Sequence, residues 1–261
     1  PANVSAIDLS AQSGNVTITK AGTYELSGTL KGSVEINVGK NDTVRLILNN
    51  ATIQAKSGPA IISTQGEKLI LSMPSGTKNA VSDGAYDSNG SGADAAIFVQ
   101  DDLTINGEGQ LSVTSGYYDA IKTKDTLKLM SGSYVITAAD DGIVGRDFIY
   151  VHDGAYVLEV SGDAMKTTYD TDDFKGDIII ENGTFDIQAG NDGIQSEHRL
   201  SLYDGNYKIQ TGGGSVNGVT AENAFEKGGF GRWNEASSNA LQSEDTPSAK
   251  GIKSGSDMVL Y

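Results

Sequence analysis

Acidic residues recur in this chain within one repeated string, and their spacing suggests metal chemistry. Asp119 lies in YYDAIKTKD, and Asp141 lies in TAADDGIVGRD, directly after Asp140. Two later copies of the string, SGDAMKTT and GNDGIQSE, place Asp163 and Asp192 at the same point. Adjacent carboxylates repel each other unless a cation or a hydrogen-bond donor neutralises them. Oxygen ligands of this kind suit a hard cation, above all Ca²⁺.

Other residue types share the interval that separates these aspartates. The steps from Asp119 to Asp141 and from Asp141 to Asp163 are 22 residues, and the step from Asp163 to Asp192 is 29. Steps of 22, 29 and 22 residues separate the members of a glycine column and of an aromatic column, namely Gly132, Gly154, Gly183 and Gly205, and Tyr134, Tyr156, Phe185 and Tyr207. Several columns with one interval indicate an internal structural repeat.

The pattern inside each repeat predicts the fold. Short β-branched or aromatic runs alternate with period two and are separated by Gly, Asn, Asp and Ser. Three such strands fit one coil of a parallel β-solenoid, and the strict register disfavours an antiparallel sandwich. We therefore predict an all-β chain, with residues 1–261 forming a single right-handed parallel β-helix domain with coils of about 22 residues. Loop insertions are expected near residues 83–94, 168–176 and 212–249.

Composition narrows the function classes. The 261 residues include no cysteine and two histidines, and the formal net charge is −15. These values exclude disulfides and thiolate zinc sites, and the acidic balance argues against nucleic acid or an anionic membrane as a partner. No run approaches the length of a membrane span. The start at Pro1 is consistent with a processed secreted protein, and the final MVLY suggests that a further coil or cap followed.

Stacking of the coils would turn the repeated aspartates into a ladder. Asp119, Asp141, Asp163 and Asp192 should then have Cα atoms about 4.8 Å apart. Calcium ions between coils would neutralise the ladder, with Asp140 as a further ligand. The insertion TYDTDDF adds three more candidate ligands, Asp170, Asp172 and Asp173. In the alternative interpretation, each aspartate caps its own turn by accepting backbone N–H bonds.

Longer stretches resemble a known family. The runs AGTYELSGTL, DTVRLILNNATIQ and DAAIFVQDDLTINGEGQLSV, with the repeated D-[AG]-[IM] coils, resemble the bacterial carbohydrate-binding β-helix domain that binds cellulose and acidic sugars. The resemblance covers essentially the whole chain. It implies bound calcium, a secreted or cell-surface location and binding to plant cell-wall polysaccharide without known catalysis. The implied fold is similar to that of the calcium-dependent pectate lyases of polysaccharide lyase family nine.

A lyase is the alternative function that this similarity raises. Asp119 and the pair Asp140-Asp141 match the lyase pattern, but Val144 stands where the lyases have a further acid. β-Elimination also needs a base, and Lys122 or Lys166 would have to serve. A ladder of carboxylates would hold the pKa of either lysine up, so charge balance is the simpler role for both. A structural solenoid stabilised by metal is the third hypothesis.

Aromatic and basic side chains are the candidates for sugar contact. Trp233, the only tryptophan, lies in GGFGRWNE and would either stack on a sugar ring or fold over the coils as a lid. The other substrate-binding candidates are Tyr118, Tyr169, Arg146, Lys122 and Lys166. We therefore predict a non-catalytic, calcium-dependent module that binds cellulose or polygalacturonate.

Overall fold

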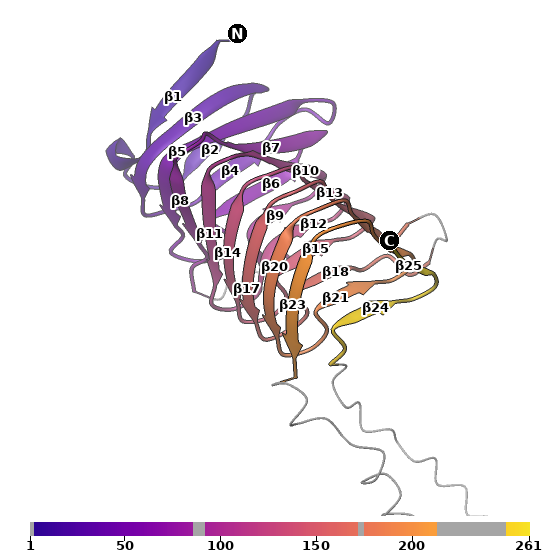
Figure 1. The fold of residues 1–261 in the computed structure, drawn as a ribbon. Helices are drawn as coiled ribbons and strands as arrows, with labels where there is room; N and C mark the ends of the chain where they lie inside the picture. Colours follow the sequence, from indigo (N-terminus) through magenta and orange to yellow (C-terminus); the bar gives the residue numbers. More distant parts are fainter. Residues whose placement is uncertain (1–2, 86–91, 172–174, 213–248) are drawn as a thin grey trace, which may run out of the picture.

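The chain winds into a parallel β-helix, and most of its coils contribute one strand to each of three faces (Figure 1). The computed structural model describes residues 3–85, 92–171, 175–212 and 249–261. Strands of these segments pair in parallel within a 16-stranded and a nine-stranded sheet. The helical content of the described residues is one 3₁₀ turn, η1, Leu9–Ala11. The predicted all-β, parallel architecture is thereby confirmed.

The nine-stranded sheet forms one side of the solenoid, here called the first face. Its strands follow each other in chain order along the sheet. They are β2 (Val16–Ile18), β4 (Val34–Asn37), β6 (Ile61–Gln65), β9 (Ala95–Val99), β12 (Asp119–Thr123), β15 (Ile143–Gly145), β18 (Met165–Thr167), β21 (Ile194–Ser196) and β24 (Ile252–Ser254).

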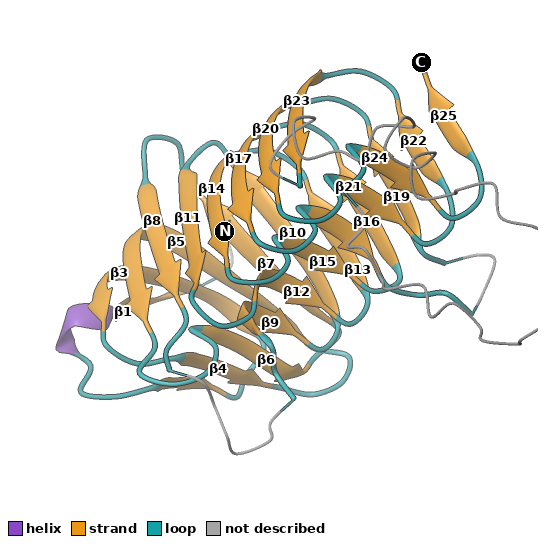
Figure 2. Cartoon of the chain, turned by 90° about the horizontal axis from the view of Figure 1, so that it is seen from below, coloured by secondary structure: helices purple, strands orange, loops and turns teal. Residues whose placement is uncertain are grey.

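The 16-stranded sheet supplies the other two sides, which Figure 2 shows from below. The second face contains β7 (Lys68–Met73), β10 (Asp102–Gly107), β13 (Thr126–Leu129), β16 (Phe148–Val151), β19 (Asp177–Ile180), β22 (Leu200–Leu202) and β25 (Met258–Leu260). The third face contains β8 (Lys78–Ser82), β11 (Gln110–Ser115), β14 (Ser133–Ala138), β17 (Ala155–Val160), β20 (Thr184–Ala189) and β23 (Asn206–Thr211).

One long strand joins the second and third faces. Strand β5 (Thr43–Gln54) pairs with β7 through its first half and with β8 through its second half. Between the halves lies Asn50, whose φ of 55° is left-handed, a conformation that asparagine tolerates better than most residues. Beyond β5, the sheet continues to β3 (Gly22–Leu30) and β1 (Val4–Asp8).

The columns expected from the sequence are hydrogen-bonded neighbours. Tyr134 pairs with Tyr156, and Phe185 pairs with Tyr207. The register also survives the gap before the last coil, because Ile194 pairs directly with Ile252. Equivalent repeat positions therefore lie one above another along the solenoid.

In most strands alternate residues point inward, and these residues form the main apolar core. The aromatic column forms a continuous stack, with ring centroids 4.8 Å apart for Tyr134–Tyr156, 4.7 Å for Tyr156–Phe185 and 4.9 Å for Phe185–Tyr207. The first three rings lie inside the core, and Tyr207 is half-buried at its end. Each tyrosine of the stack donates its hydroxyl to a turn carbonyl three residues earlier, as Tyr156 does to Asp153 O at 3.0 Å. The predicted internal aromatic ladder is confirmed. Across the described segments, no helix has the length and apolarity needed to cross a membrane.

Candidate metal site and aspartate ladder

The repeated aspartates lie at the turn that leads from the third face to the first face. Asp119 begins β12, and its equivalents lie two residues before the first residues of β15, β18 and β21. Asp119, Asp141, Asp163 and Asp192 are all buried. The turn is tight, since a Cβ at Gly142 would approach the carbonyl oxygen of Ala164 to 2.5 Å. At Gly142 itself the turn therefore leaves no room for a side chain, whereas Ala120 and Ala164 show that a single methyl group fits at the equivalent position of other coils.

Each ladder aspartate bonds to the backbone of the next coil through Oδ1. The N–H of Asp141 donates to Asp119 at 3.1 Å, and the N–H of Asp163 donates to Asp141 at 2.7 Å. Asp163 and Asp192 accept in the same way from Asp192 and Lys250, both at 2.7 Å. The interpretation in which each aspartate caps its own turn was therefore wrong in one respect, because the N–H that Oδ1 accepts comes from the following coil.

The second carboxylate oxygen of the ladder residues meets lysines. Lys122 Nζ lies 2.6 Å from Asp94 Oδ2 and 2.8 Å from Asp119 Oδ2. Lys166 Nζ lies 2.5 Å from Asp141 Oδ2 and 3.3 Å from Asp163 Oδ2. Between the two lysines in the same column lies Val144, which is buried. The lysines thus provide charge balance along the ladder, and Lys253 continues it at 3.4 Å from Asp192 Oδ2. Val144 interrupts the lysine column between Lys122 and Lys166, as Gln195 does between Lys166 and Lys253.

The electrostatics hold both lysines in the charged form. Burial alone would lower the pKa of Lys122 and Lys166, but the neighbouring aspartates outweigh burial, and the pKa of each lysine is raised. Burial raises the pKa of the Asp119 carboxyl to about 6, although Lys122 opposes the shift. An aspartate that is this costly to ionise favours a further cation nearby.

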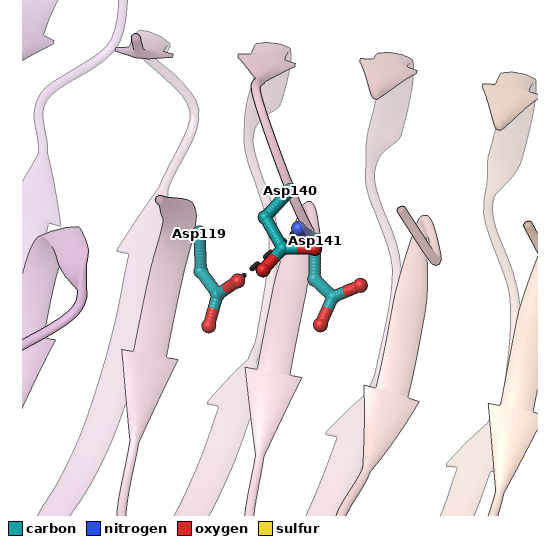
Figure 3. Close-up of side chains that lie close together, drawn as sticks. All are labelled: Asp119, Asp140 and Asp141. Carbon is teal, nitrogen blue, oxygen red and sulfur yellow. Dashed lines mark hydrogen bonds between the residues drawn. The ribbon is translucent and has the colours of Figure 1, made fainter. Parts of the chain in front are cut away.

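A group of three carboxylates lies at the rung of Val144. One oxygen each of Asp119, Asp140 and Asp141 lies within 4.8 Å of the others. Figure 3 shows the Asp140 carboxylate between the side chains of Asp119 and Asp141. Asp140 is exposed to solvent, whereas the other two are buried. Room for this group depends on Gly162, where a Cβ would lie 2.8 Å from Asp140 Oδ1.

The remaining metal candidates are not brought into this group. Asp163 and Asp192 belong to the ladder, but each lies on a later coil. Asp170 is exposed and follows β18, whereas the ladder aspartate of that coil precedes β18. Asp172 and Asp173 lie outside the described residues, as does Trp233.

Two of the substrate-binding candidates contact each other at the opposite edge of the first face. The Arg146 guanidinium lies 4.4 Å from the centroid of the Tyr169 ring, and Lys175 Nζ lies 4.8 Å from the same centroid. Lys175 also forms an ion pair with Asp147 at 2.5 Å. Two cations on one ring leave Tyr169 less able to stack on a sugar. The Arg146 side chain is 48% exposed and so remains accessible to a ligand, while Tyr118 is half-buried beside Asp119.

A second acidic column at this edge was missed in the sequence. Asp101, Asp125 and Asp147 follow three successive first-face strands. Burial raises the pKa of Asp101 and of Asp125, and Asp147 adds repulsion at Asp125. Asp125 and Asp147 repeat at the same interval as Asp119 and Asp141, so the signal was present.

Comparison with known proteins gives a consistent result. Residues 12–261 match the family model described as "Carbohydrate-binding domain-containing protein". A protein of that description from Acetivibrio thermocellus is 30% identical over 214 residues, which are 80% of this chain and 74% of the relative. A solved structure, the gadolinium derivative of "the polysaccharide lyase-like protein from C. thermocellum", superposes with a TM-score of 0.80 at 23% identity. That match covers 99% of this chain and 96% of the other, and it supports the fold assignment.

Proposed function

Because the chain belongs to the family of carbohydrate-binding domain-containing proteins, we propose that it is a non-catalytic, calcium-dependent polysaccharide-binding module. Ca²⁺ would lie at the group formed by Asp119, Asp140 and Asp141. Its ligand would be a plant cell-wall polymer, and a secreted or cell-surface location follows from that partner.

The observation that carries the metal assignment is the position of Asp140. Lys122 and Lys166 each bridge two aspartates, but neither forms an ion pair with Asp140 among the described contacts. The third carboxylate therefore adds negative charge at the rung where Val144 interrupts the lysine column. Oxygen donors alone, irregularly placed and partly open to solvent, fit Ca²⁺ better than zinc or copper. Gly162 preserves the space beside these oxygens.

The surroundings of the group favour an acidic polysaccharide such as polygalacturonate. An exposed cation site on the edge of the first face can bind a uronate carboxylate directly. Lys124 and Arg146 follow adjacent strands of the same face and supply positive charge for other uronates. Lys122 and Lys166 lie between these edges, where they also balance the ladder.

A lyase is less well supported by the same residues. The proton next to the uronate carboxylate needs a base, and both candidate lysines have raised pKa values. Val144, where the lyases carry an acid, removes a ligand as well. Neither lysine is therefore poised to remove that proton.

Sedimentation with insoluble polygalacturonate, with calcium or with a chelator, tests the proposal. We expect binding in calcium, loss of binding in chelator, and loss in the Asp140→Asn variant in either condition. Ultraviolet absorbance from unsaturated uronate ends should stay flat over a long incubation. A rise that disappears in Lys166→Met would identify a lyase. Calcium-dependent melting without any binding would instead identify a structural solenoid.

A further inference from the structure

The third face presents a regular surface to solvent. Strands β11, β14, β17, β20 and β23 are each six residues long and alternate between inward and outward positions. Every outward position on these five strands is exposed or half-buried. Their pairing proceeds without a register shift from β11 to β23. The outward side chains therefore form straight columns on a sheet without bulges.

These outward side chains are mostly uncharged hydrogen-bonding groups. In strand order they are Gln110, Ser112, Thr114, Ser133, Val135, Thr137, Ala155, Val157, Glu159, Thr184, Asp186, Gln188, Asn206, Lys208 and Gln210. Of the three charged residues, Asp186 and Lys208 pair with each other at 2.9 Å. Glu159 is the remaining charge, in a chain whose net charge is −15. The face is therefore close to neutral on a strongly acidic protein.

Small apolar patches complete this surface. Val135 and Val157 are paired neighbours, and they are 39% and 51% exposed. Beside them, Glu159, Gln188 and Gln210 line a shallow depression of about 230 Å³. A polysaccharide offers the matching chemistry, since its hydroxyls donate and accept hydrogen bonds and its C–H groups contact small apolar side chains.

Charge selects between classes of polysaccharide. On strands β11, β14, β17, β20 and β23 a uronate polymer would find no cation except Lys208, whose charge Asp186 already neutralises. A neutral polymer needs no counter-charge, so it gains no binding energy from the edge of the first face that carries Asp119, Asp140 and Asp141. No aromatic side chain points outward from these five strands, and two exposed rings elsewhere, Tyr203 and Tyr261, stack on each other with centroids 4.7 Å apart. Hydrogen bonding on a sheet then becomes the available mode of recognition.

We infer that the outer surface of β11, β14, β17, β20 and β23 is a second binding face, which takes a neutral, extended polysaccharide without calcium. The inference rests on the carbohydrate-binding role proposed above. It adds a separate surface to that role, with a different ligand class and a different dependence on metal.

The test compares two double variants of matched chemistry. Thr114→Glu/Thr137→Glu places two carboxylates on adjacent strands of the third face, where both threonines are exposed. Thr17→Glu/Thr19→Glu adds the same charges at exposed positions of the first face. Binding to microcrystalline cellulose in chelator should weaken about ten-fold or more for the first variant, because a carboxylate pressed against a neutral polymer loses its hydration. The second variant should bind as wild type.

Each other outcome has a distinct meaning. Equal cellulose binding by wild type and Thr114→Glu/Thr137→Glu, or loss only in Thr17→Glu/Thr19→Glu, would overturn the inference. Cellulose binding that disappears in chelator, or no cellulose binding by wild type, would overturn it too. If polygalacturonate sedimentation in calcium persists in these cases, the calcium-dependent function stands. Melting curves of both variants in chelator confirm that each is folded.

Discussion

The backbone N–H of Asp163 donates to Oδ1 of Asp141 at 2.7 Å, and the two residues belong to successive coils. The same contact recurs from Asp119 to Lys250. Each ladder aspartate therefore has two structural roles, because Oδ1 accepts a hydrogen bond from the backbone of the next coil while Oδ2 faces a lysine. Asp140 makes neither of these contacts among the described residues, so the proposed calcium binding should be separable by mutation from the stability of the fold.

Substitutions of Asp163 test the contribution of the Oδ1 hydrogen bond to the stability of the fold. In Asp163→Ala, the N–H of Asp192 loses its acceptor and Lys166 loses one partner, so unfolding in urea should require about 2–4 kcal/mol less free energy. Asp163→Asn keeps an oxygen for the N–H and should lose about half as much or less. Equal losses in the two variants would contradict the assigned role of Oδ1.

Substitution of Asp140 tests the proposed binding of calcium at the three-carboxylate group. Calcium at a hundred-fold excess over its dissociation constant should stabilise the wild type by about 2.7 kcal/mol, visible as a higher melting temperature. Asp140→Asn should lose this gain but melt like wild type in chelator, since its side chain is exposed and outside the ladder bonds. The matched control is Asp204→Asn, another exposed turn aspartate, which should keep the full response. A normal calcium response in Asp140→Asn would remove this residue from the site.

Asp119 predicts an unusual pH dependence in the absence of calcium. Its pKa in the folded chain is about 6, above the ordinary 3.8, because the carboxyl is buried. A raised pKa means that the folded state takes up a proton where the unfolded state does not, so this group adds stability as the pH falls through 6. In chelator, the melting temperature of the wild type should therefore rise relative to that of Asp119→Asn as the pH falls to 5.5. Identical pH profiles for the two proteins would refute the shift.

The aromatic stack predicts a graded loss of stability. Tyr156→Ala removes a buried ring between two stacked neighbours and should cost about 3–5 kcal/mol in unfolding free energy. Tyr156→Phe keeps the ring and loses the bond to Asp153 O, at a cost of about 0.5–1.5 kcal/mol. Chemical denaturation followed by tyrosine fluorescence measures both. A Phe variant as unstable as the Ala variant would place the main contribution in the hydroxyl bond.

The fold was predictable because its signal repeats. Tyr134, Tyr156, Phe185 and Tyr207 are spaced by the coil, and a shared interval in several columns leaves few alternatives to stacked coils. The role of Oδ1 was less visible, because a sequence does not show which N–H lies above which carboxylate. The lysine bridges were foreseen only as charge balance. The spacing of Lys122 and Lys166 predicts that they share a column. The structure adds that Val144, which interrupts this column, belongs to the same coil as Asp140 of the three-carboxylate group.

The second acidic column shows a different limit. Asp125 and Asp147 repeat as regularly as the ladder, yet they lie after the strand where Asp119 and Asp141 lie before it. The adjacent pair Asp140-Asp141 made the acidic signal stronger at the edge of the first face that precedes its strands. The hydrogen-bonding surface of the third face was equally hidden, because serine, threonine and glutamine in outward positions look like ordinary solvated strands.

The coil-to-coil bonds of the ladder also determine how the chain would respond to mechanical load. From β12 to β24, each coil is joined to the next through the parallel strands and through one aspartate contact, so tension applied along the axis would peel coils from an end in sequence. An ion held by Asp119 and Asp141 would link two coils at one point and raise the force needed to separate them. If the protein is held by a polysaccharide under load, its coils should then resist unfolding to higher forces when calcium is present.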